Sequence, residues 1–218
     1  MSQRSHDAPD PYRGRTPTSH ERLAGQPWDA SYHHGPAPWD VGHPQEAVVR
    51  IAAAGGFTGR VLDAGCGTGE NALHLAALGR PVLGVDVAET AVAAARAKAN
   101  ERGLKADFDV ADAFELASLG RTFDSVLDCG LFHSLDADER QRYLSSVASV
   151  AERGATLYVL CFSDRGAELG PHPVSEGELR SAFERSGSWQ VIAIDADRVE
   201  TRFHDHGAPA WLATCRRS

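Results

Sequence analysis

Glycine and acidic residues lie together in one short stretch of this 218-residue chain. The sequence from Val61 to Glu70 reads VLDAGCGTGE, so an apolar segment leads into three glycines at alternating positions. Glycine is needed where the backbone approaches a ligand closely or takes a positive φ. Because such a turn lies at the carboxyl end of a strand, where open α/β sheets bind ligands, it predicts a small-molecule site.

The acids of this stretch decide between possible ligands. A dinucleotide fold has the pattern G-x-G-x-x-G, but Glu70 stands at the sixth position and Asp63 lies two residues before the first glycine. Both acids would place negative charge beside a pyrophosphate, and the Gly-Lys-Ser/Thr of a phosphate-binding loop is absent. We therefore expect a ligand with no phosphate and a positive charge. S-adenosylmethionine, with its ammonium, sulfonium and ribose diol, has these features.

Two further acids follow the next two strands. Asp86 ends an apolar run about 20 residues after Gly65, where a carboxylate can accept hydrogen bonds from both ribose hydroxyls. Asp112 follows the third strand, and its carboxylate can accept a hydrogen bond from an adenine amine. Acids at three neighbouring strand ends indicate a nucleoside site more strongly than the glycine turn does alone.

The elements that position these residues alternate along the chain. Apolar or alternating runs predict strands over 60–64, 81–86, 105–110, 123–129, 155–162, 189–195 and 210–215. Helical spacing predicts helices over 44–54, 69–78, 88–102, 136–150 and 175–185. This alternation predicts an α/β fold with one doubly wound, mostly parallel sheet and helices on both faces. The last two strands, separated only by a loop at 204–209, predict an antiparallel hairpin at one edge.

Composition and charge exclude several classes of function. A net charge of −8 disfavours nucleic acid and anionic membranes as partners. The four cysteines form no CxxC pair, so neither a zinc ribbon nor a disulfide framework is expected. The first residues lack the apolar core of a secretory signal, and no apolar run approaches the roughly 18 residues of a membrane helix. We expect a cytoplasmic protein that is a monomer or a homodimer.

The same residues resemble class I S-adenosylmethionine-dependent methyltransferases. The resemblance rests on four motifs, DAGCGTG at 63–69, GVDV at 84–87, ADAF at 111–114 and FDSVLDCGLFH at 123–133. It implies a seven-stranded sheet of order 3-2-1-4-5-7-6 with the seventh strand antiparallel. It also implies that the methionine end of the cofactor is held by Asp63, Gly65 and Gly67, the ribose by Asp86, the adenine by Val87, Asp112 and Ala113, and the ammonium by the backbone of Asp128 and Cys129. Cys66 is a further expected contact of the cofactor.

An aromatic segment before the glycine turn is similar to that of the thiopurine, thiol and halide methyltransferases and related bacterial small-molecule enzymes. In that branch the segment forms a lid, which implies that Trp28, Tyr32 and Trp39 lie near the sulfonium and the substrate. Aromatic faces attract cations. Cys129 stands where thiopurine enzymes have an arginine, so thiopurine-like recognition is not expected. The expected organisation is a disordered tail over 1–25 and a methyltransferase domain over 26–218, with the lid and first helix at 26–58 and a Rossmann-like core at 59–218.

The expected activity is methyl transfer to an oxygen, nitrogen or sulfur atom of a small aromatic or heterocyclic molecule. His133, just past the fourth strand, is the best-placed general base for a protonated acceptor, and Asp40, beside Trp39, is a weaker candidate. The alternatives are a non-catalytic S-adenosylmethionine-binding module and a nicotinamide oxidoreductase, which Glu70 disfavours. No metal site is expected, because the His204-Asp205-His206 triplet fits an exposed loop better than a set of metal ligands.

Overall fold

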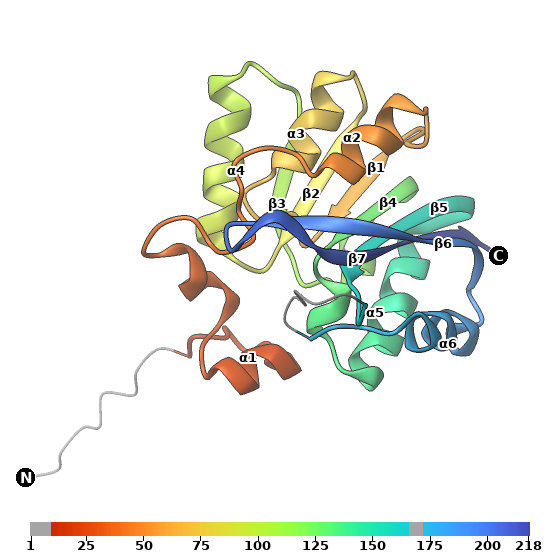
Figure 1. Ribbon diagram of the computed structural model, residues 1–218. Helices are drawn as coiled ribbons and strands as arrows, with labels where there is room; N and C mark the ends of the chain where they lie inside the picture. The colour runs from red at the N-terminus through yellow and green to blue at the C-terminus, as the bar shows by residue number, and fades with distance from the viewer. Residues whose placement is uncertain (1–9, 166–171) are drawn as a thin grey trace, which may run out of the picture.

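The sheet has seven strands in the order β3-β2-β1-β4-β5-β7-β6, which confirms the predicted topology (Figure 1). The computed structural model describes residues 10–165 and 172–218. Strands β1 to β5 pair in parallel, and β7 is antiparallel to both β5 and β6. The strands are β1 (Val61–Ala64), β2 (Val82–Asp86), β3 (Asp107–Val110), β4 (Phe123–Cys129), β5 (Ala151–Phe162), β6 (Trp189–Thr201) and β7 (His204–Arg217).

Helices cover both faces of the sheet, with α2, α3 and α4 on one side and α5 and α6 on the other (Figure 1). Consecutive residues of a strand point to opposite faces, so Val61 of β1 packs in the core under α2 and α3, and Leu62 packs in the core under α5 and α6. The helices are α1 (Ser19–Ala24), α2 (Glu46–Ala53), α3 (Glu70–Ala77), α4 (Glu89–Glu101), α5 (Ala137–Val150) and α6 (Glu176–Ser186), with 3₁₀ turns η1 (Trp28–Tyr32), η2 (Leu116–Leu119) and η3 (Phe132–Ser134).

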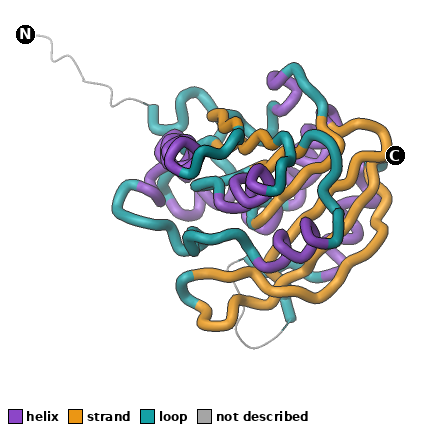
Figure 2. The backbone as a smooth tube through the Cα atoms, turned by 90° about the horizontal axis from the view of Figure 1, so that it is seen from above, coloured by secondary structure: helices purple, strands orange, loops and turns teal. Residues whose placement is uncertain are grey.

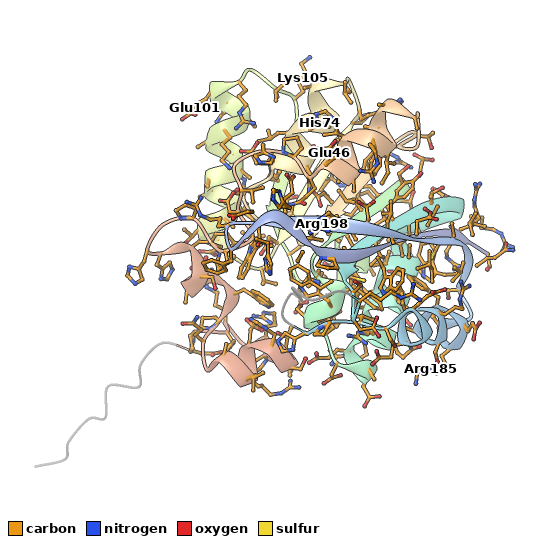
Figure 3. All side chains as sticks on the ribbon, in the orientation of Figure 1. Glu46, His74, Glu101, Lys105, Arg185 and Arg198 are labelled. Carbon is orange, nitrogen blue, oxygen red and sulfur yellow. The ribbon has the colours of Figure 1, made fainter. Side chains whose placement is uncertain are left out.

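The last two strands form a long antiparallel pair along one edge of the molecule (Figure 2). The loop expected at 204–209 is wrong, because these residues are the first half of β7, in register with β6 from Thr201↔His204 to Arg198↔Pro209. Backbone pairing outweighs the turn-like composition here, and Arg198, labelled in Figure 3, donates to the carbonyl oxygens of His206 and Gly207. The exposed loop expected around His204 is therefore a strand. The Nδ1 of His204 forms a hydrogen bond with Thr201 Oγ1 at 2.7 Å.

The segment before the aromatic lid is ordered where the structure describes it, so a disordered tail over 1–25 is wrong for residues 10–25. Thr18 caps α1, and Glu21 completes a capping box with it. Glu21 is fully buried and accepts hydrogen bonds from Arg15 at 2.5 and 2.8 Å. The sequence suggested disorder because the segment lacks large aliphatics, but paired charges and caps hold it instead. Residues 1–9 lie outside the described part of the chain.

In the described residues, no helix combines the length and apolar character needed to cross a membrane.

Candidate active site

A cavity of about 320 Å³ lies at the carboxyl ends of β1, β2 and β4, beneath the lid. Every residue that the sequence assigned to the site lines this cavity except Asp63 and Asp128. The lining also includes residues that the sequence did not assign, among them His20 and Arg15 near α1 and Phe203 at the tip of the β6–β7 pair. The fold therefore brings together the glycine turn, the acids at the strand ends and the aromatic segment.

The glycine turn is built as its spacing predicted. Gly67 has a φ of +51°, and a Cβ atom there would lie 3.1 Å from the hydroxyl oxygen of Tyr32. Gly69 has a φ of +85° at the N-cap of α3, and a Cβ atom there would meet Phe108 at 2.8 Å. The absence of a side chain at Gly67 thus allows the lid to approach the turn, and its absence at Gly69 allows α3 to pack against the sheet.

Asp86 connects the end of β2 with the glycine turn. Its Oδ2 accepts a hydrogen bond from the backbone N–H of Gly67 at 2.8 Å, and its Oδ1 accepts one from Ala88 at 2.9 Å. Burial raises the pKa of this carboxyl above its ordinary value, while these backbone donors oppose the rise. Each carboxylate oxygen has a second lone pair, so both remain able to accept hydrogen bonds from a ligand in the cavity.

Two buried acids, Asp63 on β1 and Asp128 on β4, lie on neighbouring strands below the turn. Neither carboxylate oxygen of Asp63 has a hydrogen-bond partner among the described residues, and the same holds for Oδ2 of Asp128. Burial, together with the charge of Asp128, raises the pKa of Asp63 to about 7, and burial raises that of Asp128 to about 6. A buried carboxylate without a partner is costly. These atoms therefore fit a positively charged group placed at the turn, such as the ammonium of S-adenosylmethionine.

Glu70 does not oppose a phosphate in the way that the sequence suggested. Its carboxylate pairs with Lys98 at 2.8 Å and with Arg102 at 2.8 Å, so its charge is compensated by α4 and does not act against a phosphate. Asp63 and Asp86 have no such cation within salt-bridge distance in residues 10–165 and 172–218. Among the acids that the sequence placed at the turn, these two therefore lack a compensating cation.

Three aromatic rings of the lid pack on one another over the cavity. Trp39 donates a hydrogen bond from its indole N–H to the Tyr32 hydroxyl at 2.9 Å. Trp28 meets Trp39 edge to face, with ring centroids 5.6 Å apart. Asp29 fastens η1 to the core, because it accepts a hydrogen bond from the backbone N–H of Thr90 at 2.7 Å. The aromatic segment is thus an ordered wall of the cavity.

Residues 38–45, which follow these rings, are joined to β6. The backbone N–H of Arg202 donates to the carbonyl of Pro38 at 2.8 Å. Gln45 exchanges two hydrogen bonds with the backbone of Glu200, at 2.7 and 3.0 Å. Asp40 lies between these anchors and lines the cavity, and its Oδ1 accepts a hydrogen bond from the backbone of Gly42 at 3.3 Å.

His133 lies on the opposite wall, in η3 after β4. The ring is buried, packs against Phe162 with centroids 4.4 Å apart, and its Nδ1 has no hydrogen-bond partner within the described residues. Burial lowers its pKa to about 3, and the neighbouring His172, Arg140 and His20 act in the same direction. The imidazole is therefore neutral at physiological pH, with an acceptor or donor nitrogen available to a ligand.

Both thiols of the site are protonated. Burial raises the pKa of Cys66 and of Cys129 well above the ordinary value, and the nearby carboxylates raise both further. A thiol held in this state is a poor nucleophile, so neither cysteine fits the role of a catalytic nucleophile.

The sequence missed the contribution of α1 to the site. His20 stacks on Trp28 with centroids 4.4 Å apart and an interplanar angle of 8°. Glu21 accepts a hydrogen bond from the backbone N–H of Trp28 at 3.0 Å. The Thr18-x-x-Glu21 pattern, which is a capping box, was the available signal for this helix.

Comparisons with known proteins agree with this geometry. A family model described as "Methyltransferase domain" matches residues 61–154. The 2-heptyl-1-hydroxyquinolin-4(1H)-one methyltransferase of Mycobacteroides abscessus is 38% identical over 205 residues, which cover 90% of this chain and 83% of that protein. A structure solved in work on the conversion of a disulfide bond into a thioacetal group during echinomycin biosynthesis is also 38% identical, with a TM-score of 0.76 and coverage of 84% and 86% of the two chains. The magnesium protoporphyrin IX methyltransferase of Synechocystis PCC 6803, solved with bound S-adenosylmethionine, is 27% identical, with a TM-score of 0.60 and coverage of 79% and 76%.

Proposed function

Because this chain belongs to the S-adenosylmethionine-dependent methyltransferases, we propose that it methylates a hydroxyl or thiol group on a small, flat heteroaromatic molecule. The observation that supports this acceptor is the chemistry of the cavity, which is lined by the Asp86 carboxylate and by aromatic rings of the lid, with the unpartnered carboxylate of Asp63 buried below the glycine turn. Trp28, Trp39 and Phe162 offer flat apolar surfaces to such a ring. The hydroxyquinolinone named for the relative from Mycobacteroides abscessus has the same chemical character.

S-adenosylmethionine supplies a methyl group bonded to a positively charged sulfur. In our proposal, Asp63 and the backbone at Asp128 and Cys129 receive the ammonium, because the buried Asp63 oxygens have no partner of their own. The backbone of Gly65, Cys66 and Gly67 lies along the methionine, and Asp86 accepts the ribose hydroxyls through its remaining lone pairs. Val87, Asp112 and Ala113, which line the same side of the cavity, contact the adenine.

The lid has two roles in this proposal. Tyr32 and Trp39, linked by their hydrogen bond, present aromatic surface to the positively charged sulfonium of the cofactor. Trp28, held by Glu21 and stacked with His20, covers the acceptor and excludes water that would compete for the methyl group. We retain the division into residues 26–58 and 59–218 as lid and core, and we add α1 to the lid.

His133 and Asp40 are the proposed polar contacts of the acceptor. The Nδ1 of His133 is buried and has no partner in the described residues, and His133 lines the cavity, so in our proposal this atom forms a hydrogen bond with a hydroxyl or ring nitrogen of the acceptor. Its pKa of about 3 makes this imidazole a weak base, so we assign it mainly to binding and orientation. Asp40, beside Trp39, is the candidate for a second polar contact at the lid.

The proposal is tested by incubating the protein with isotopically labelled S-adenosylmethionine and a panel of hydroxyquinolinones, phenols, thiols and simple amines. We expect labelled product with bicyclic hydroxyl or thiol acceptors and none with small aliphatic amines. The Asp63→Asn variant, which removes the charge with little change of shape, serves as the matched negative control. Tight cofactor binding without product across the whole panel would instead favour a non-catalytic binding module.

A further inference from the structure

A pair of histidines joins the lid to the far wall of the acceptor cavity. His20 Nδ1 on α1 lies 3.2 Å from His172 Nε2, a hydrogen bond that requires one of the two nitrogens to be an acceptor. Both side chains line the cavity, and their ring centroids are 5.2 Å apart. His20 makes this one side-chain hydrogen bond within the described residues, so its second nitrogen, Nε2, is available to a bound molecule.

The two rings differ in their access to water. His20 is half-buried, since one face stacks on Trp28, whereas His172 is exposed. A proton received inside the cavity by His20 can therefore pass along the hydrogen bond to His172 and then to solvent. His133 has no such route, because its ring is buried and its Nδ1 has no partner in the described part of the chain.

We propose that His20 and His172 together take up the proton that is released when a protonated hydroxyl or thiol group is methylated. This inference rests on the proposed function. As the acceptor oxygen or sulfur forms its bond to the methyl carbon, the carbon–sulfur bond of the sulfonium breaks and its electron pair stays on that sulfur. The acceptor's proton moves to His20 Nε2, the proton on His20 Nδ1 moves to His172 Nε2, and a proton leaves His172 for water. The step therefore converts the sulfonium cofactor and the protonated methyl acceptor into one neutral thioether, one methylated product and one released proton, so atoms and charge balance.

The charged groups around His20 are consistent with a neutral resting state of its ring. On the lid, Glu21 favours a proton on His20, but its charge is compensated by Arg15. On the core side, the His133 ring lies near both histidines, and Arg140 lies near His133. Burial and the proximity of His172 lower the pKa of His20, so its ring is free to take up a proton at neutral pH.

The test uses one acceptor that needs a base and one that does not. One is a phenol that is protonated at the assay pH, and the other is an aromatic thiol that is fully ionised at the same pH. His20→Phe keeps the stacking on Trp28 but cannot take a proton. His172→Asn suits the left-handed backbone at this position, where φ is +52°. His34→Asn, an exposed lid residue away from the cavity, is the control.

We expect His20→Phe to lower kcat for the phenol by about 100-fold, in the range of a lost general base. His172→Asn should give a smaller loss with the phenol, and both variants should keep most of the activity with the ionised thiol. An equal loss with both acceptors would overturn the proposal, because it would show a packing role for the pair. Undiminished turnover of the phenol would also overturn it, as would a phenol-selective loss seen only in a His133→Phe variant. A wild-type protein that methylates neither acceptor nor any other member of the panel contradicts the proposed function itself, a result distinct from these.

Discussion

The backbone N–H of Gly67 donates a hydrogen bond to Asp86 Oδ2 over 2.8 Å, so the glycine turn after β1 and the acid that ends β2 form one unit. The carboxylate orients the turn, and the turn in turn fixes the carboxylate. Because each Asp86 oxygen uses one lone pair on the backbone, the remaining lone pairs point in defined directions. This unit is the proposed ribose site, and it can be altered at either residue.

Replacing Asp86 should weaken cofactor binding. The Asp86→Ala variant loses both acceptors for the ribose hydroxyls, and we expect at least a tenfold increase in the Kd for S-adenosylmethionine, or ~1.4 kcal/mol. Isothermal titration calorimetry on the folded variant measures this directly. Asp109→Ala, an acid on β3 that pairs with Arg96 at the surface, is the matched control and should leave the Kd unchanged. Unaltered affinity in Asp86→Ala would remove this residue from the ribose site.

A methyl group at Gly67 should displace the lid. The Cβ of Gly67→Ala would lie 3.1 Å from the Tyr32 hydroxyl at a φ of +51°, so the variant suffers both backbone strain and a close contact. Gly79→Ala has a similar φ of +79° but no atom within 4 Å, so it isolates the strain. We expect both variants to lose about 1 kcal/mol of stability, measured by urea unfolding. Only Gly67→Ala should also bind cofactor several-fold more weakly, and equal binding by the two variants would contradict the contact with the lid.

The local parts of the site could be predicted from the sequence, because each depends on a short motif. The glycine turn and Asp86 at the end of β2 needed only the spacing of small, apolar and acidic residues to be recognised. His20 could not be predicted as a site residue. It lies on a helix that is distant in sequence from the glycine turn, and only the fold brings that helix to the cavity. The charge of Glu70 was also misjudged, since Lys98 and Arg102 compensate it from the next helix. The low pKa of His133 follows from its burial in the folded core, which no motif reports.

Loss of the Glu21 carboxylate should loosen the lid without damaging the cofactor site. Glu21 accepts hydrogen bonds from the backbone of Thr18 and Trp28 and pairs with Arg15. In Glu21→Ala these donors lose a buried partner, so we expect a rise of several-fold in the acceptor KM, with a smaller change in the cofactor Kd. Steady-state kinetics with each substrate varied in turn separates the two effects. Glu101→Ala, an exposed acid on α4 (Figure 3), should change neither constant. A lid that contributes nothing to acceptor binding would leave the KM of Glu21→Ala at the wild-type value.

The contribution of the buried acids Asp63 and Asp128 to the stability of the ligand-free protein should fall as pH rises. The pKa of Asp63 is about 7 in the folded chain and near 3.8 when exposed, so the folded state holds a proton that the unfolded state releases between these values. Asp128, with a folded pKa of about 6, acts in the same direction. Their contribution to stability is complete below about pH 4 and is lost as the pH rises toward 7.

The Asp63→Asn variant lacks one of the two carboxyl groups whose titration links stability to pH. It also tests whether Asp63 receives the ammonium. We expect the ligand-free variant to unfold at a higher temperature than the wild type at about pH 8 and to show a flatter dependence of Tm on pH between about 5 and 8, as measured by differential scanning calorimetry. In the presence of S-adenosylmethionine the order should reverse, because the wild-type carboxylate gains a cation that the amide cannot hold. A variant that is less stable than the wild type without cofactor at high pH would show that the carboxylate is stabilised by the protein alone, and Asp63 would then not be the group that the ammonium completes.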